Sequence, residues 1–188
     1  MEVFEKLLDP ELYAYFKNAT FYENPVFHTA HKMVDFYIEF ENVIPLEIYE
    51  QIITKLQLSL HAHVKLHMHT KNSVIEMDEL DRYVNFFVEK YSDVKDFRFL
   101  HPYLENDTIC FSTRDESRLA ALNLALPSLM EKLADVGITQ EIVCKKVEDD
   151  IEIETAKVQV STPVVKQEPV KKQYPSSNSY KKESATTY

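Results

Sequence analysis

The feature that most limits the fold of this chain is its glycine content, because its 188 residues include a single glycine, Gly137. Glycine adopts left-handed backbone angles without strain, and loops that bring the backbone close to a phosphate depend on it. The sequence therefore has no Walker loop, no dinucleotide-binding GxGxxG and no GxxG clamp of the kind that KH domains use on RNA. Most classes of nucleotide-using enzyme are excluded on this ground.

Charge divides the chain into an acidic body and a basic tail. The whole chain carries −10, and residues 155–188 hold six lysines and two glutamates, so the first 154 residues carry −14. A body this acidic repels a nucleic-acid backbone unless its basic residues gather on one face, and the sequence shows no such gathering. The charge balance therefore disfavours direct DNA contact.

The carboxy-terminal segment has the composition of a disordered linker. From Thr155 onward it lacks Leu, Ile and Phe, and it is rich in Ser, Thr, Pro, Lys and Gln. Such a composition buries too little apolar surface to offset the entropy lost on ordering. We predict that residues 151–188 are a disordered linker to domains absent from this chain, with a plain disordered tail as the alternative.

The order of hydrophobic periodicities repeats once along the body. The first series is a helix near 2–17 that restarts at Pro10, strands near 20–28 and 33–41, a helix from Pro45 to 60, and a strand over 61–69. The second series is a helix near 74–91, strands near 96–103 and 107–112, a helix over 114–136, and a strand over 140–148. Each half reads α-β-β-α-β, which predicts an α+β fold of two units, residues 1–71 and 72–150.

Local signals predict the helix ends of the second series. Ser73 and Glu76 have the spacing of a capping box, and so do Thr113 and Glu116. Pro127 is expected to kink or break the last helix, because proline removes a helical hydrogen bond and crowds the preceding turn. The single glycine is expected to end that helix.

Four of the seven histidines lie in one short stretch, which raises the question of a metal site. Alternation places its apolar residues on the inner face of a strand and its histidines on the outer face: His61, His63, His67 and His69. A His-x-His pair on a strand can hold zinc, but a third ligand must come from elsewhere, and Lys65 in the row opposes a cation. The sequence favours a polar strand face over a zinc site. Because histidine titrates near neutrality, a pH-sensitive face is a further hypothesis.

No set of residues in the sequence indicates a catalytic site. Cys110 and Cys144 lie in apolar, strand-like surroundings that suit reduced core thiols. Phe36 and Phe40 lie on the apolar face of an alternating strand, which predicts core positions rather than a base-stacking platform. We expect a non-enzymatic segment with no catalytic residue and no cofactor. No apolar run is long enough for a membrane span and no signal peptide is visible, so a cytoplasmic protein is expected.

The stretch 34-VDFYIEFENVIPLEIYEQI-52 resembles the amino-terminal region of PolC-type DNA polymerase III alpha subunits, the replicative polymerases of low-GC Gram-positive bacteria. A hydrophobic strand, the segment ENVIP and a helix beginning LEIYE carry the resemblance. Residues 11–40 resemble the opening helix and first hairpin of the family. Residues 107–123 and 136–150 resemble its second unit, so the resemblance covers 4–150.

The resemblance implies a non-catalytic module of a bacterial replicative polymerase. In the family this region precedes an OB-fold domain, a PHP domain with an inserted proofreading exonuclease, and the polymerase core. The full-length protein would thus be a DNA-directed DNA polymerase with 3'-5' exonuclease activity. The first unit is similar to a KH-like fold and to the carboxy-terminal domain of the clamp-loader tau subunit. Contacts with replisome proteins are therefore implied, with tau or other parts of the polymerase as partners.

The helix over 46–57 is the candidate contact surface, because its apolar residues spread over more of its circumference than one buried stripe needs. Ile48, Tyr49 and Ile52 are the candidate contact residues, and the alternative is that this helix packs between the two units. A second function remains open, namely a KH-like module that binds single-stranded nucleic acid with steep salt dependence. The third is a small zinc protein that depends on its histidines.

Overall fold

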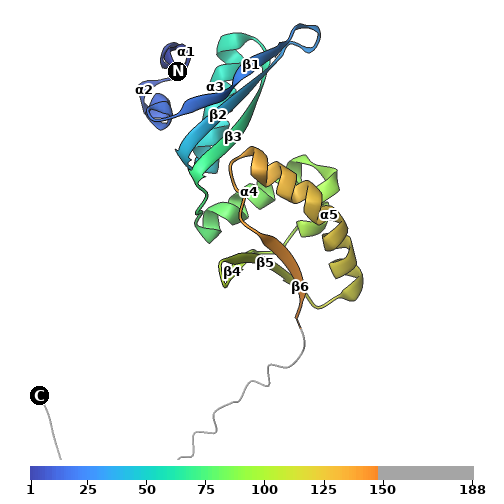
Figure 1. Ribbon diagram of the computed structural model, residues 1–188. Coiled ribbons are helices and arrows are strands. Elements are labelled where there is room, and N and C mark those ends of the chain that lie inside the picture. The colour runs from blue at the N-terminus through green and yellow to red at the C-terminus, as the bar shows by residue number, and fades with distance from the viewer. Residues whose placement is uncertain (148–188) are drawn as a thin grey trace, which may run out of the picture. The chain divides into compact units, whose positions relative to one another are not determined.

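Two small three-stranded sheets and the helices around them make up the part of the chain that the computed structural model describes, residues 1–147 (Figure 1). These residues all belong to one compact unit. The predicted linker, residues 151–188, lies outside the described residues. Among the helices of residues 1–147, none has the length and hydropathy needed to cross a membrane.

The first sheet has β2 at its centre and consists of β1 (Thr20–His28), β2 (Met33–Asn42) and β3 (His63–Asn72). β1 pairs antiparallel with β2 through a short turn, η2 (Thr29–His31), whereas β3 pairs parallel with β2. A parallel neighbour requires a crossover, which α3 (Leu46–Leu60) supplies. The predicted β1, β2 and α3 are confirmed to within a residue of their expected ends, whereas the strand predicted over 61–69 begins two residues later and ends three residues later.

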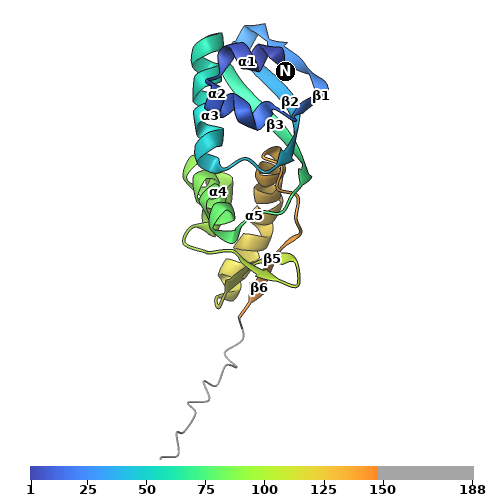
Figure 2. The ribbon, with the colours of Figure 1, turned by 90° about the vertical axis from the view of Figure 1, so that its left-hand side faces the viewer.

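Three short helical segments precede the first sheet and lie over the same face of it as α3 (Figure 2): α1 (Glu2–Leu7), α2 (Pro10–Tyr13) and η1 (Ala14–Phe16). The ring of Phe4 packs 4.7 Å from the ring of Phe16 and 5.1 Å from that of Phe36. The predicted restart at Pro10 is confirmed, because α2 begins at this proline. Its fixed φ suits the first helical position.

The second half repeats this order with α4 (Met77–Lys90), η3 (Ser92–Phe97), β4 (Tyr103–Glu105), β5 (Thr108–Thr113), α5 (Glu116–Asp135) and β6 (Ile142–Lys146). β4 pairs antiparallel and β6 pairs parallel with the central β5, as in the first sheet. The predicted α-β-β-α-β order is therefore confirmed in both halves. The KH-like and tau-like descriptions of the first unit, and the boundary between residues 71 and 72, stay predictions.

The core follows the alternation of the central strand. Val34, Phe36, Ile38 and Phe40 are all buried, and Val64, Leu66 and Met68 of β3 lie beside them in register. Burying such side chains contributes about 1.5–3 kcal/mol each. The prediction that Phe36 and Phe40 are core residues is confirmed.

Both predicted capping boxes are wrong. α4 begins at Met77 after Glu76, and Ser73 lies outside its first turn. α5 is capped by Asp115, whose Oδ1 accepts hydrogen bonds from the backbone N–H of Ser117 at 2.7 Å and of Arg118 at 3.2 Å. The reason is that β5 runs on through Thr113, so the helix starts two residues later than the spacing suggested.

The strand predicted over 96–103 is also wrong. Residues 92–97 form a 3-10 turn instead, and only Tyr103–Glu105 pair with β5. Pro102 has no N–H for a sheet ladder, which limits the strand. The guanidinium of Arg118 donates to the carbonyl of Arg98 at 2.7 Å and so holds the turn in place.

The predicted break of the last helix does not occur, because α5 continues through Pro127 as one helix. Pro127 is exposed. The carbonyl of Asn123, which loses its usual N–H partner to the proline, also belongs to an exposed residue and can be hydrated.

Gly137 ends α5 as predicted, and its position requires glycine. Its φ is +84°, and a Cβ atom there would collide with the side chain of Thr70 on β3. The hydroxyl of Thr70 also donates to the Gly137 carbonyl at 2.6 Å. Gly137 thus joins the end of α5 to the first sheet.

Replacing Gly137 with alanine should lower the free energy of unfolding by more than ~1 kcal/mol, because it adds both left-handed strain and a steric clash. Urea unfolding followed by circular dichroism measures the change. Ser59→Ala, at an exposed position in α3, is the control and should stay within about 0.5 kcal/mol of the parent. Equal stability of the Gly137→Ala variant and the parent would contradict this account of the turn.

Candidate functional site

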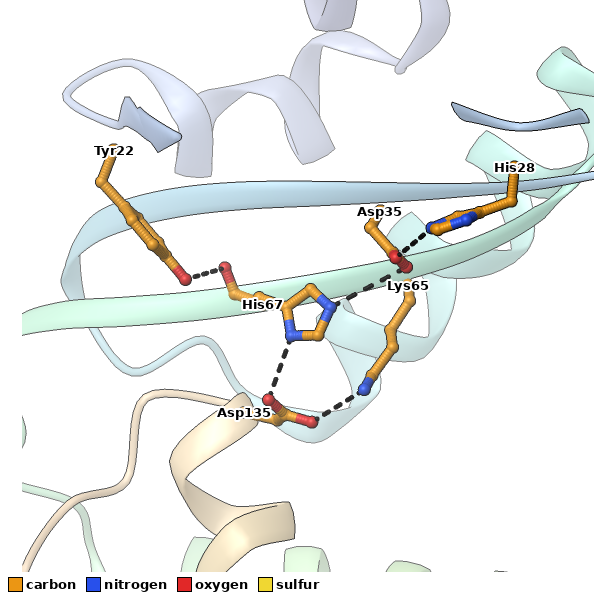
Figure 3. Close-up of polar contacts among 6 residues, drawn as sticks. All are labelled: Tyr22, His28, Asp35, Lys65, His67 and Asp135. Atoms are coloured by element: carbon orange, nitrogen blue, oxygen red, sulfur yellow. Dashed lines mark hydrogen bonds and ion pairs between the residues drawn. The ribbon is translucent and has the colours of Figure 1, made fainter. Parts of the chain in front are cut away.

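A network of polar side chains runs across the outer face of the first sheet to the end of α5 (Figure 3). Its members come from β1, β2, β3 and α5: Tyr22, His28, Asp35, Lys65, His67 and Asp135. Along these strands the apolar residues point to the inner face of the sheet, and the residues between them point to the outer face. Polar residues at the intervening positions must therefore meet one another or water.

Asp35 lies at the centre of this network and is 8 % exposed, which makes it the one buried charged residue among residues 1–147. Its Oδ2 accepts a hydrogen bond from Nε2 of His28 at 2.8 Å. Its Oδ1 has no hydrogen-bond partner in the described residues, and Nε2 of His67 lies 3.8 Å away. That distance allows an ion pair but is too long for a hydrogen bond. Burial of this carboxylate is thus offset by imidazoles on two sides.

His67 connects the sheet to α5. Its Nδ1 lies 3.1 Å from Oδ1 of Asp135, and its ring is stacked on Tyr37 at 4.6 Å. Nζ of Lys65 reaches the other oxygen of Asp135 at 3.2 Å. Asp135 is the last residue of α5, where the helix dipole adds negative potential, so cationic side chains are favoured at this point. The imidazole of His67 therefore lies between two carboxylates, hydrogen-bonded to that of Asp135 and within ion-pair distance of that of Asp35.

The structure separates the four clustered histidines. His61 ends α3 in a left-handed conformation and lies outside the strand, so its predicted place in the alternating row is wrong. His63 and His69 lie on the outer face as predicted, and the ring of His69 stacks on Tyr22 at 3.9 Å. Only His67 enters the polar network. Within residues 1–147, no three His, Cys, Asp or Glu side chains converge in a way that could hold a metal ion.

A cleft of about 440 Å³ opens where α3, β3, α4 and α5 meet. Aromatic and charged side chains line much of it: Tyr49, Lys65, Phe86, Lys90, Tyr91 and Lys132. Nζ of Lys90 lies 5.2 Å from the ring centre of Phe86, and Nζ of Lys132 lies 4.7 Å from that of Tyr91. Such cation–π contacts hold the two ammonium groups against aromatic rings that line the cleft. Lys65 and Asp135 belong to both the cleft and the polar network, so the two features are contiguous.

The three residues proposed as partner contacts have different surroundings. Ile52 has no exposed surface and belongs to the core, and Ile48 is half-buried. Tyr49 lines the cleft, with its ring 6.2 Å from that of Tyr83 and 6.3 Å from that of Phe86. Burial raises the pKa of Tyr49 to about 12, so its hydroxyl stays neutral. The helix therefore packs against α4, and Tyr49 is the candidate that also faces open space.

Asp35 and Asp135 were missed by the sequence reasoning. Asp35 alternates with Phe36 along β2 and so lies on the outer face, but this alternation gives no sign that the carboxylate is buried. Asp135 lies 68 residues from His67 in the chain, and no local pattern connects the two. The cleft residues of α4 and α5 were missed for the same reason.

The two cysteines of the described residues lie in β5 and β6 of the second sheet, outside the polar network and the cleft. Cys110 is buried and Cys144 is half-buried, and burial raises the pKa of the Cys144 thiol to about 11. A thiol with this pKa is almost wholly protonated at neutral pH and reacts slowly.

The His67→Ala substitution should lower the free energy of unfolding by about 1–2 kcal/mol, because it removes the stack on Tyr37 and leaves buried Asp35 with one imidazole. His63→Ala on the same strand is the matched control, since His63 is exposed and outside the network. Thermal and urea unfolding of both variants measure the difference. Equal losses in the two variants would show that the network contributes nothing specific.

Comparison with known proteins gives one family match. The family model described as DNA polymerase III polC-type N-terminus I matches residues 2–70. The matched segment runs from α1 to within β3, and so covers nearly all of the first sheet and its helices. No curated protein matches the chain significantly.

Proposed function

We propose that this chain is an amino-terminal module of a PolC-type DNA polymerase III that mediates protein–protein contacts in the bacterial replisome, because residues 2–70 match the family model of that region. The family match is the observation that carries the proposal. It confirms the predicted resemblance for the first unit and connects the chain with DNA replication.

The second unit extends the same proposal. It has the same strand order and pair orientations as the first, and it begins directly after β3. We attribute it to the same amino-terminal region. The catalytic domains of the full-length polymerase, and the 3'-5' exonuclease activity implied by the resemblance, would lie outside this chain.

A contact role suits the chemistry of the described residues. The charged side chains of the polar network pair with one another, and the half-buried thiol of Cys144 is protonated at neutral pH. The cleft at the junction of α3, β3, α4 and α5 offers aromatic rings bordered by lysines. Aromatic side chains in a recess are the usual anchors of protein interfaces. We assign the partner contact to this cleft, with the clamp-loader tau subunit or another part of the polymerase as its partner.

The Thr54→Arg substitution tests this assignment, because Thr54 is exposed on α3 and lines the cleft. A long charged side chain there should obstruct the cleft and weaken partner binding at least ~10-fold, which is ~1.4 kcal/mol. Biolayer interferometry of the immobilised chain with purified tau, and with the remainder of the polymerase, measures the affinity.

Ser59→Arg is the control for this experiment, since Ser59 is exposed on the same helix and lies outside the cleft. It adds the same charge and should leave the affinity within twofold. Absence of binding to both partners, or equal weakening by the two variants, would refute the proposal.

One observation favours the second candidate function, the binding of single-stranded nucleic acid. Rings of Tyr22 and His69, and of Tyr37 and His67, form stacked pairs on the outer face of the first sheet. Bases can stack on such rings. Against this, carboxylates of the polar network lie on the same face and repel phosphates.

Fluorescence anisotropy with a labelled single-stranded oligonucleotide separates the two functions. The contact role predicts no measurable binding at 50 mM salt, because the body is acidic. Nucleic-acid binding predicts affinity that falls steeply between 50 and 200 mM salt and is reduced by Tyr22→Ala. The second outcome would replace the protein-contact proposal.

A further inference from the structure

α5 has an apolar stripe on the side that faces solvent. The stripe consists of Ala120, Leu124, Pro127, Met130 and Ala134, all of which are exposed. Leu124 stands out, with 83 % of its surface accessible. An exposed helix face is ordinarily polar, so a row of five uncharged residues, bordered by the exposed Asn123 and Glu131, indicates a surface that meets another protein.

A shallow pocket of about 320 Å³ lies beside the carboxy-terminal half of this stripe. Met130, Glu131 and Ala134 form its helical side, and Ile138 and Ile142 form its apolar floor. A projecting leucine and a pocket of this size on one helix are complementary features. Leu124 cannot fill the pocket of its own chain, because the pocket begins at Met130. The six residues from Leu124 to Met130 span about 9 Å along the helix.

The residues of the stripe are placed symmetrically about Pro127 in the sequence. Alanine lies seven residues away on each side, and a larger apolar residue lies three residues away on each side. When two copies of the helix pack antiparallel about a two-fold axis at Pro127, residue 124 of one copy lies opposite residue 130 of the other. Residue 120 likewise stands level with residue 134. An interface of this kind uses the same patch on both subunits.

We propose that a second copy of this chain docks on the stripe, with the two α5 helices antiparallel and Pro127 at the two-fold axis. Leu124 of the partner subunit then enters the hole between Pro127, Met130, Glu131 and Ala134. This is the arrangement of four helical positions, i, i+3, i+4 and i+7, into which a knob packs. Three of these four residues line the pocket.

The polar residue that borders the hole also finds a partner. Glu131 stands level with Asn123 of the partner subunit, whose side-chain amide can donate a hydrogen bond to the carboxylate. Both residues are exposed in the single chain. The arrangement therefore leaves no like charges face to face at the centre of the interface.

The predicted association is weak and strengthens with salt. A single pair of helices buries an area at the small end of protein interfaces, which is typical of weak, transient contacts. The two copies each carry −10, so their long-range repulsion is relieved by screening. A contact based on ion pairs would weaken with salt instead.

Sedimentation equilibrium of the full chain from ~5 to ~500 µM, at 50 and 300 mM salt, tests the proposal. The expected result is a monomer–dimer equilibrium that shifts toward dimer at the higher salt. Leu124→Gln should weaken the dimer at least ~10-fold, because it replaces the apolar knob. Ala134→Gln, which fills the hole from the other side, should weaken it similarly.

Leu58→Gln is the matched control, because Leu58 is 67 % exposed on α3 and away from the stripe. It makes the same chemical change at an exposed helical position and should leave the dimer unchanged. All three substituted residues are exposed, so circular dichroism should show the parent fold in each variant. A parent chain that stays monomeric at 500 µM, or equal weakening by Leu58→Gln and Leu124→Gln, would overturn the proposal.

Discussion

The alternation of apolar side chains in β2 is the constraint on which the rest of this structure depends. Phe36 and Ile38 point into the core under α1 and α3, and the strand pairs on both of its edges. A shift of one residue would turn this apolar set outward and remove the core contacts of both neighbours. The same alternation places Asp35 and Tyr37 on the opposite face, and so creates the surface on which the polar network forms.

The junction of the two sheets combines a polar network with a cleft, and each affects the other. The pairing of Asp135 with His67 and Lys65 anchors the end of α5 to β3, and the turn at Gly137 continues that contact. With α5 held there, its last turn forms one wall of the cleft, and α3, α4 and β3 form the others. The cleft that we assign to partner binding is therefore a consequence of how α5 is anchored.

α5 has three roles that its sequence has to satisfy together. Its buried side, including Leu122 and Leu129, packs in the core, its last residue enters the polar network, and its outer stripe is free for a second chain. A helix with apolar residues on two sides shows little amphipathic contrast, which is why periodicity alone did not reveal the outer stripe. Pro127 is tolerated because it lies on that outer side.

Sequence alone determined the order of elements, the apolar faces of β2 and β3 and the glycine at the end of α5, because periodicity and backbone preference act over a few residues. The short segments were less well determined: β5 runs on through Thr113 and so moves the cap of α5 to Asp115. The segment before Tyr103 is held by hydrogen bonds made after packing, such as the one from Arg118 to Arg98. The network around Asp35 and the cleft were decided only by the tertiary structure. Their members are distant in the chain, since His67 and Asp135 alone are 68 residues apart, and a carboxylate becomes buried or exposed only through what the fold places over it.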